Sequence, residues 1–164
     1  MMRLAREHLV PVPVVYEVRE DALVMERIPG ESLLARIGRR PWTLPAAAGV
    51  IADLHERLHA IPFEGGRLVH FDLHPDNVLI GPDGPVLIDW TNAHGGDPEA
   101  DVALTWLIAE TSAGLGGRFF ARLFARIVGR EAVRRGLPEA SAFRVADPHV
   151  TDAERARVRR LRLP

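Results

Sequence analysis

The sequence contains neither cysteine nor lysine. The absence of cysteine excludes a disulfide framework and a thiolate metal site, and it fits a reducing compartment. The absence of lysine excludes every mechanism that needs a side-chain ammonium group, since all 21 basic residues are arginine.

Excess charge and long apolar runs are also scarce. The net charge of -1 gives no reason to expect nucleic acid or an anionic membrane as a partner. The first seven residues carry charges where a signal peptide needs an apolar run, and no stretch approaches the length that spans a bilayer. We therefore expect a soluble, cytoplasmic protein. With 164 residues and 47% hydrophobic composition, it can bury a substantial core.

The N-terminal part predicts a β-hairpin followed by two helices. A β-branched strand, a tight turn at Glu20–Asp21 and a second strand that ends before Pro29-Gly30 form the hairpin. Helical spacing of apolar residues then predicts the helices, with Thr43 as the N-cap of the longer one. The four expected elements are Val12–Val18, Leu23–Ile28, Ser32–Ile37 and Pro45–Ala60.

The rest of the chain predicts a β-ribbon embedded in helices. Three short apolar runs are expected as strands, Leu68–Val69, Val78–Ile80 and Val86–Ile88, with a hairpin turn at Gly81–Gly84. Three helices are expected after them, Val102–Ala113, Arg118–Arg135 and Asp152–Leu161, separated by breakers at Gly114–Gly117 and Gly136–Pro138. We also expect the apolar stripe Phe119, Phe120, Leu123, Phe124 and Ile127 to lie in the core. The predicted fold class is α+β.

Residues 70–77 carry a pattern that is typical of phosphoryl transfer. They read H-x-D-x-x-x-x-N, with His70, Asp72 and Asn77 at the fixed positions, and Asp89 closes an apolar strand further on. Phosphoryl transfer needs a carboxylate near the acceptor hydroxyl, plus oxygen ligands that hold Mg²⁺ on the phosphates. The intervening hairpin turn should return Asp89 to the side of Asn77. Amide and carboxylate oxygens are ligands that Mg²⁺ prefers.

A simpler explanation exists for each of these residues alone. Each acidic residue could end a strand or stabilise a turn, and Asn77 could cap a turn. Their order along the chain, together with Gly96-Asp97-Pro98, favours a functional site. Asp97 itself is expected to cap the helix that follows Pro98.

These motifs, together with residues 96–103, resemble the aminoglycoside phosphotransferase and choline kinase family, a branch of the protein-kinase-like fold. The resemblance implies a remnant N-terminal-lobe hairpin and hinge over residues 1–30 and a helical C-terminal lobe over residues 31–164. It also implies roles for the catalytic-loop residues. Asp72 would be the catalytic base in a loop that also contains His70. Asn77 and Asp89 would bind Mg²⁺, His70 and Asp101 would brace the loop, and His74 would shape it.

The segment Leu23–Leu33 resembles the hinge of that family, which binds adenine. Met25 would line the adenine pocket, and Glu26 and Ile28 would offer main-chain groups. The implied cofactors are Mg²⁺ with ATP or GTP. The implied acceptor is a hydroxyl of a small molecule such as an aminoglycoside or a choline-like compound.

The sequence departs from that family in what should bind the phosphates. The chain starts just before the hinge hairpin, and it has neither a glycine-rich nucleotide loop nor the strand lysine. Three explanations stay open: an N-terminally truncated fragment, a minimal kinase that uses Mg²⁺ with Arg3 or Arg6, or an inactive kinase-like binding module. The hairpin would expose strand edges, so we also expect a homodimer through that surface.

A competing motif, H-E-x-x-H, spans residues 55–59. On a helix it can place two imidazoles on Zn²⁺ with Glu56 as general base, so a zinc peptidase is a second alternative. His55 shares a helical stripe with apolar residues, which predicts packing against the core. No obvious third-ligand segment follows, although His70, His74 and His94 are available.

Overall fold

The first elements form a helix and a hairpin beside it. In the computed structural model, which describes residues 1–112 and 114–161, they are α1 (Met2–Glu7), β1 (Val15–Val18) and β2 (Leu23–Met25). The strands pair antiparallel, and the Arg19 N–H donates to the Ala22 carbonyl (2.8 Å) across the turn. The predicted hairpin is therefore confirmed, but both strands are three residues shorter than Val12–Val18 and Leu23–Ile28. Tyr16 and Val18 are 64% and 65% exposed, so one face of the hairpin is apolar and open.

Two three-stranded antiparallel sheets follow. One has the order β3-β6-β7, built from β3 (Glu31–Ser32), β6 (Val78–Gly81) and β7 (Gly84–Leu87). The other has the order β4-β5-β8, built from β4 (Pro62–Phe63), β5 (Gly66–Val69) and β8 (His94–Gly96). The predicted ribbon is the β6–β7 pair, and its turn is at Gly81 and Gly84 as expected. The strands β3, β4 and β8 were not predicted because each has only two or three residues.

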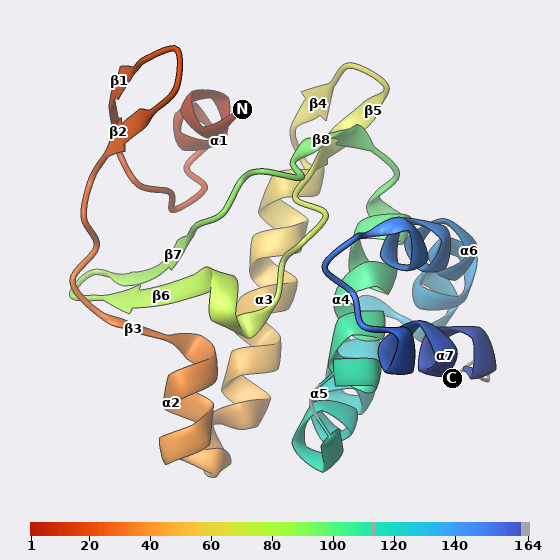
Figure 1. Ribbon diagram of the computed structural model, residues 1–164. Coiled ribbons are helices and arrows are strands. Elements are labelled where there is room, and N and C mark those ends of the chain that lie inside the picture. Colours follow the sequence, from red (N-terminus) through yellow and green to blue (C-terminus); the bar gives the residue numbers. More distant parts are fainter. Residues whose placement is uncertain (113, 162–164) are drawn as a thin grey trace.

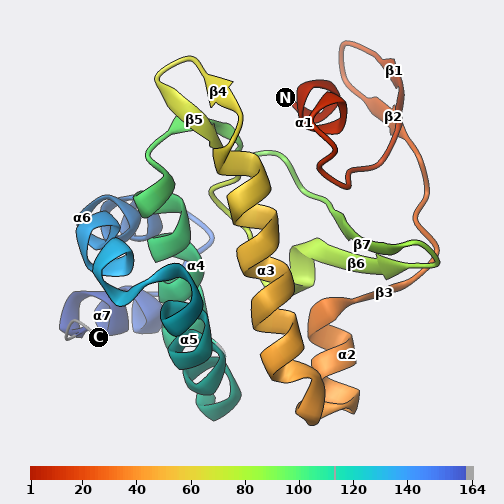
Figure 2. The same cartoon turned by 180° about the vertical axis from the view of Figure 1, so that it is seen from behind.

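The helices form the body of the molecule. They are α2 (Leu33–Arg39), α3 (Leu44–His59), α4 (Pro98–Ser112), α5 (Gly114–Val128), α6 (Arg130–Ala146) and α7 (Asp152–Arg160), with 3-10 turns at Pro41–Thr43 (η1) and Pro75–Asn77 (η2). α3 runs between the β6–β7 ribbon on one side and the group α4 to α7 on the other (Figures 1 and 2). The fold is α+β, as predicted. Among the described residues, no helix is both long and apolar enough to cross a membrane.

The C-terminal helices differ from the prediction. The expected helix Arg118–Arg135 is two helices that meet at Gly129, whose φ of 93° suits a residue without a side chain. The breaker expected at Gly136–Pro138 lies inside α6. A Cβ at Gly136 would overlap the carbonyl of Glu99 and lie 2.5 Å from the Ala100 nitrogen. Because Gly136 has no side chain, α6 can pack closely against the start of α4. This packing stabilises α6 although the helix contains Pro138.

Three smaller expectations need correction. Thr43 stands at the N-cap position of α3, but its hydroxyl donates back to the Arg40 carbonyl (2.7 Å) instead of capping. The expected breaker at Gly114–Gly117 is the first turn of α5. Phe119 and Ile127, which were expected in the core, are 53% and 52% exposed. The helix α5 is amphipathic, and these two residues lie outside its buried face. The expected end of a helix at Ala113 lies outside the described residues.

Candidate active site

The loop between β5 and β6 is held from behind by one buried carboxylate. Asp101, in the first turn of α4, accepts the backbone N–H of His70 (Oδ2, 3.1 Å) and of Phe71 (Oδ1, 2.9 Å). The His70 Nε2 lies 3.1 Å from the carbonyl of Ile88, just before Asp89. Phe71 has a φ of 58°, a left-handed conformation that is costly for a bulky residue. These contacts fix the backbone just before Asp72.

Asp72 and Asn77 form a direct pair. The Asn77 amide nitrogen donates to the Asp72 carbonyl (2.9 Å) and to its carboxylate Oδ2 (3.2 Å). Because the amide nitrogen is engaged in this way, the amide oxygen of Asn77 is the atom that can bind a cation. The Asn77 residue is buried, and the Asp72 side chain is 25% exposed.

The ribbon places Asp89 next to this pair. The Ile88 N–H donates to the Asn77 carbonyl (2.9 Å), so the end of β7 runs beside the loop of residues 70–77. Asp89 has a φ of 59° and is exposed, and the Thr91 hydroxyl donates to its Oδ1 (2.8 Å). The expectation that the hairpin turn returns Asp89 to the side of Asn77 matches this geometry.

His74 lies in the same loop, close to the side chain of Asp72. Its Nδ1 accepts the Asp76 N–H (3.3 Å), which makes it the cap of η2. The proton of a neutral ring is then on Nε2, and this atom lies 3.6 Å from Asp72 Oδ1. His74 therefore turns a positive edge toward the carboxylate of Asp72.

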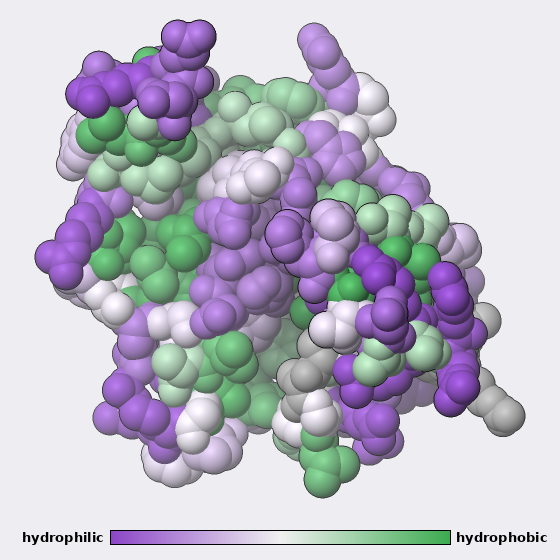
Figure 3. Space-filling view, viewed as in Figure 1, coloured by the Kyte–Doolittle hydropathy of each residue, from purple (hydrophilic) through white to green (hydrophobic). Residues whose placement is uncertain are grey.

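Asp72 and Asp89 line one open cavity of about 700 Å³. Polar groups from the α6–α7 side face them, and hydrophilic residues gather in the middle of this face of the molecule (Figure 3). The lining also contains Arg144, Asp147 and His149, which were not among the residues predicted from the sequence. Arg144 reaches the cavity because α6 continues past Pro138, where a break was expected. No local motif marks it.

Burial and charge shift the protonation of three site residues. Burial raises the pKa of Asp72 and the nearby Asp89 adds to this, against the opposing effects of His74 and Arg144. Burial lowers the pKa of His70 to about 4, so the ring is neutral near pH 7. Burial also acts to raise the pKa of Asp101, but the imidazoles of His55 and His59 outweigh it and hold that pKa well below the usual range. The brace is thus a carboxylate under physiological conditions.

The hinge segment lies against the ribbon. A Cβ at Gly30 would overlap the Ile80 carbonyl, and one at Gly81 would lie 3.2 Å from the Ile28 side chain. The Glu26 N–H donates to the Val14 carbonyl (2.8 Å), and its carboxylate accepts the Val14 N–H (3.0 Å). The prediction of adenine binding therefore rests on the Glu26 carbonyl and the Ile28 N–H. Met25 is 40% exposed at the end of β2.

The H-E-x-x-H motif lies on α3, behind the loop of residues 70–77. His55 is buried, as its helical stripe predicts. The group that joins His55 and His59 is Asp101, and not one of the three histidines considered from the sequence. Asp101 is 42 residues away from His59, so only the packing of α4 against α3 reveals it.

Comparisons with known proteins agree with this geometry. Residues 65–137 match the sequence model of the phosphotransferase enzyme family, a segment that contains Asp72, Asn77, Asp89 and Asp101. The crystal structure of a choline/ethanolamine kinase family protein from Mesorhizobium loti superposes with a TM-score of 0.57 and 17% identity. That superposition covers 96% of this chain and 76% of the other, and it shows the fold.

Two curated proteins match about half of the chain. A probable bifunctional tRNA threonylcarbamoyladenosine biosynthesis protein from Methanoculleus marisnigri is 33% identical over 90 residues, 55% of this chain. The serine/threonine-protein kinase PkaB from Streptomyces coelicolor is 35% identical over 88 residues, 52% of this chain. The matched segments are 15% and 21% of those proteins, so the chain spans only a small part of either relative.

The fold and the arrangement of the site resemble those of kinase-like phosphotransferases. Residues 65–137, which contain the candidate catalytic and metal-binding residues, are thus similar to the phosphotransferase enzyme family, and the fold is similar to that of the choline/ethanolamine kinase family protein.

Proposed function

We propose that this chain transfers the γ-phosphoryl group of ATP or GTP, as the Mg²⁺ complex, to a hydroxyl of a small molecule. The observation that carries the proposal is the Asp72–Asn77 hydrogen bond, with Asp89 lining the same cavity as Asp72. A base next to two oxygen donors is the arrangement that phosphoryl transfer requires.

Each of the three side chains has a distinct part in this proposal. Asp72 orients the acceptor hydroxyl and takes its proton. The amide oxygen of Asn77 and the carboxylate of Asp89 are hard oxygen donors, a set that fits Mg²⁺ and leaves positions for phosphate and water. When bound, the ion neutralises charge on the transferred group. His70 and Asp101 keep the loop in place without touching substrate.

The nucleotide would lie between the hinge and this cavity, with Met25, Glu26 and Ile28 at the base. With no lysine in the sequence, arginine is the permanently charged side chain that these residues can offer the phosphates. Arg6 donates to the Val12 carbonyl (3.4 Å), whereas Arg3 lines a cavity of about 270 Å³ together with Trp90, the neighbour of Asp89. Arg3 is therefore the better candidate for a phosphate contact.

A second cavity suggests the acceptor class. It measures about 650 Å³, borders His74, and is lined mainly by apolar residues from α2, α4 and α5. Among its described lining residues, Asp76 is the one carboxylate and Arg144 the one guanidinium. A polycationic aminoglycoside needs several carboxylates, so we favour a hydroxyl compound with an apolar body and little net charge.

The test is transfer of label from γ-labelled ATP or GTP to a panel of alcohols that range from aminoglycosides to apolar compounds. We expect transfer that needs Mg²⁺ and falls by about 10²- to 10⁴-fold in Asp72→Asn, the range for loss of a general base. Asp83→Asn, in the exposed turn between β6 and β7, is the matched control and should keep full transfer. Transfer that survives in Asp72→Asn would refute the assigned role.

The absence of lysine favours one alternative, a catalytically inactive kinase-like binding module. That alternative predicts nucleotide binding without transfer to any alcohol in the panel. We also propose a cytoplasmic location, where ATP and Mg²⁺ are present. The chain would self-associate through the exposed β1–β2 hairpin.

A further inference from the structure

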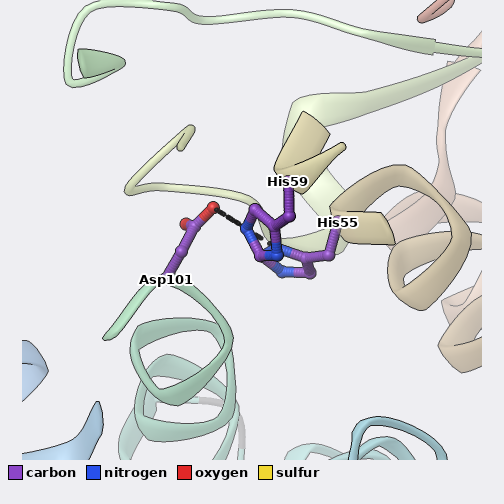
Figure 4. A group of neighbouring side chains, drawn as sticks. All are labelled: His55, His59 and Asp101. Carbon is purple, nitrogen blue, oxygen red and sulfur yellow. Dashed lines mark hydrogen bonds and ion pairs between the residues drawn. The ribbon is translucent and has the colours of Figure 1, made fainter. Parts of the chain in front are cut away.

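Two imidazoles and a carboxylate converge behind the catalytic loop (Figure 4). His55 and His59 lie one turn apart on α3, and both face Asp101 on α4. The His59 Nε2 is 2.9 Å from Asp101 Oδ2, and the His55 Nδ1 is 3.3 Å from the same oxygen. One ligand atom from each residue lies within 4.8 Å of the others.

The hydrogen bonds around His55 leave one ring nitrogen without a proton. The Thr105 hydroxyl has a single proton, and it donates this proton to the Leu73 carbonyl (2.6 Å). Toward His55 Nε2 (2.9 Å) the hydroxyl must therefore accept, so Nε2 carries the ring proton. The Nδ1 of a neutral His55 then points a lone pair at the carboxylate of Asp101. This Nδ1 is buried and has no hydrogen-bond partner among the described residues.

In this tautomer, two hydrogen-bond acceptors, His55 Nδ1 and Asp101 Oδ2, face each other 3.3 Å apart in the interior of the protein. The contact is unfavourable unless a positive centre lies between them, and either a proton, as in the ion pairs that lower the pKa of Asp101, or a metal ion is such a centre. With metal–ligand bonds of about 2.0–2.1 Å, neighbouring ligand atoms of a tetrahedral zinc ion are separated by about 3.3 Å. The His55–Asp101 separation of 3.3 Å agrees with that value, whereas the His59–Asp101 separation of 2.9 Å is shorter and is that of a hydrogen bond, which an ion would replace.

We propose that His55, His59 and Asp101 form a site for a zinc-type divalent ion that fastens the catalytic loop to α3 and α4. Two imidazoles and one carboxylate suit Zn²⁺ far better than Mg²⁺. A cavity of about 250 Å³, lined by both histidines, gives access and room for water as a fourth ligand.

Because Asp101 also holds the loop before Asp72, an ion at this site would stabilise that loop and would not act as the ion of a peptidase. The two oxygens of Asp101 already accept the N–H groups of His70 and Phe71, immediately before Asp72. An ion bound to Asp101 would therefore stiffen the loop that carries the catalytic base. This differs from the zinc-peptidase alternative, in which the ion itself activates water.

The test titrates chelator-treated protein with Zn²⁺ against a chromophoric indicator, with excess Mg²⁺ present to fill sites made of oxygen ligands alone. We expect one equivalent of Zn²⁺ to bind with micromolar or tighter affinity. His55→Gln and His59→Gln should each weaken it by at least about tenfold, a loss of about 1.4 kcal/mol. His8→Gln, an exposed histidine outside both sites, is the matched control and should leave it unchanged.

A second measurement keeps the test decisive if a variant fails to fold. Wild-type protein loaded with Co²⁺ should show the absorption bands of a four-coordinate ion, and Zn²⁺ should abolish them. Absence of Zn²⁺ binding by folded wild type, a six-coordinate Co²⁺ spectrum, or undiminished binding in folded His55→Gln would each overturn the proposal. The outcome is independent of phosphotransfer, because neither readout involves nucleotide.

Discussion

Gly136 offers a quantitative test of how α6 packs on α4. A Cβ at this position would meet three backbone atoms, the carbonyl oxygen and carbon of Glu99 and the nitrogen of Ala100. None of them can move as a flexible side chain would. Overpacking of this kind costs about 1–3 kcal/mol, and rigid neighbours place Gly136→Ala at the upper end of that range.

Part of this cost is offset by helix propensity. Alanine is favoured over glycine in a helix by about 0.5–1 kcal/mol, so we expect a net loss of about 2 kcal/mol. For a chain of this size the loss corresponds to a fall in Tm of about 4–8 °C. Urea denaturation followed by circular dichroism measures the same loss directly.

Gly49 provides the matched control. It also lies inside a helix, α3, but a Cβ there would have no atom within 4 Å. Gly49→Ala should therefore stabilise the protein by about 0.5–1 kcal/mol. If Gly136→Ala were as stable as wild type or more stable, the close contact between α6 and α4 would be refuted.

Three further predictions concern titration and assembly. Burial lowers the pKa of His70 from 6.5 to about 4, so the unfolded chain binds more protons than the folded chain between those pH values. The free energy of unfolding should therefore fall by up to about 3 kcal/mol as the pH drops from 6.5 to 4. Urea unfolding across that range should show a smaller fall for His70→Gln, and an identical slope would contradict the assignment. Burial raises the pKa of Asp72, and a base must be deprotonated, so the acid limb of the phosphotransfer rate should lie above the ordinary range of an aspartate. A pH–rate profile checks this, and a limb at or below pH 3.8 would count against Asp72 as the base. If the exposed hairpin forms a dimer interface, light scattering should give a mass that rises with protein concentration, and Val18→Glu should lower that mass. A strictly monomeric mass at all concentrations would refute the dimer hypothesis.

The local elements were predictable because short-range patterns determine them. The turn at Gly81–Gly84 sets the register of the β6–β7 ribbon, and this register brings the end of β7 to Asn77. The H-x-D-x-x-x-x-N pattern and this turn could therefore predict that Asp72, Asn77 and Asp89 lie near one another.

The remaining features depend on contacts between distant segments. Gly136 and Pro138 look like a helix break in isolation, yet α6 continues through them because Val133, Leu137 and Ala140 are buried. Arg144 was missed for the same reason, since its position in the cavity depends on that continuity. The partnership of His55 with Asp101 likewise requires the packing of α3 against α4, which no local pattern reports.

The central claim is that Asp89 and Asn77 bind Mg²⁺ on a nucleotide. Calorimetric titration with ATP or GTP, with and without Mg²⁺, tests it on wild type, Asp89→Asn and the control Asp83→Asn. Asparagine keeps the shape of Asp89 and tolerates its φ of 59°, so the variant removes mainly the charge. We predict that Mg²⁺ tightens nucleotide binding in wild type and in Asp83→Asn, and that this gain is lost in Asp89→Asn. Wild type that binds no nucleotide under either condition, or an undiminished gain in Asp89→Asn, would contradict the account.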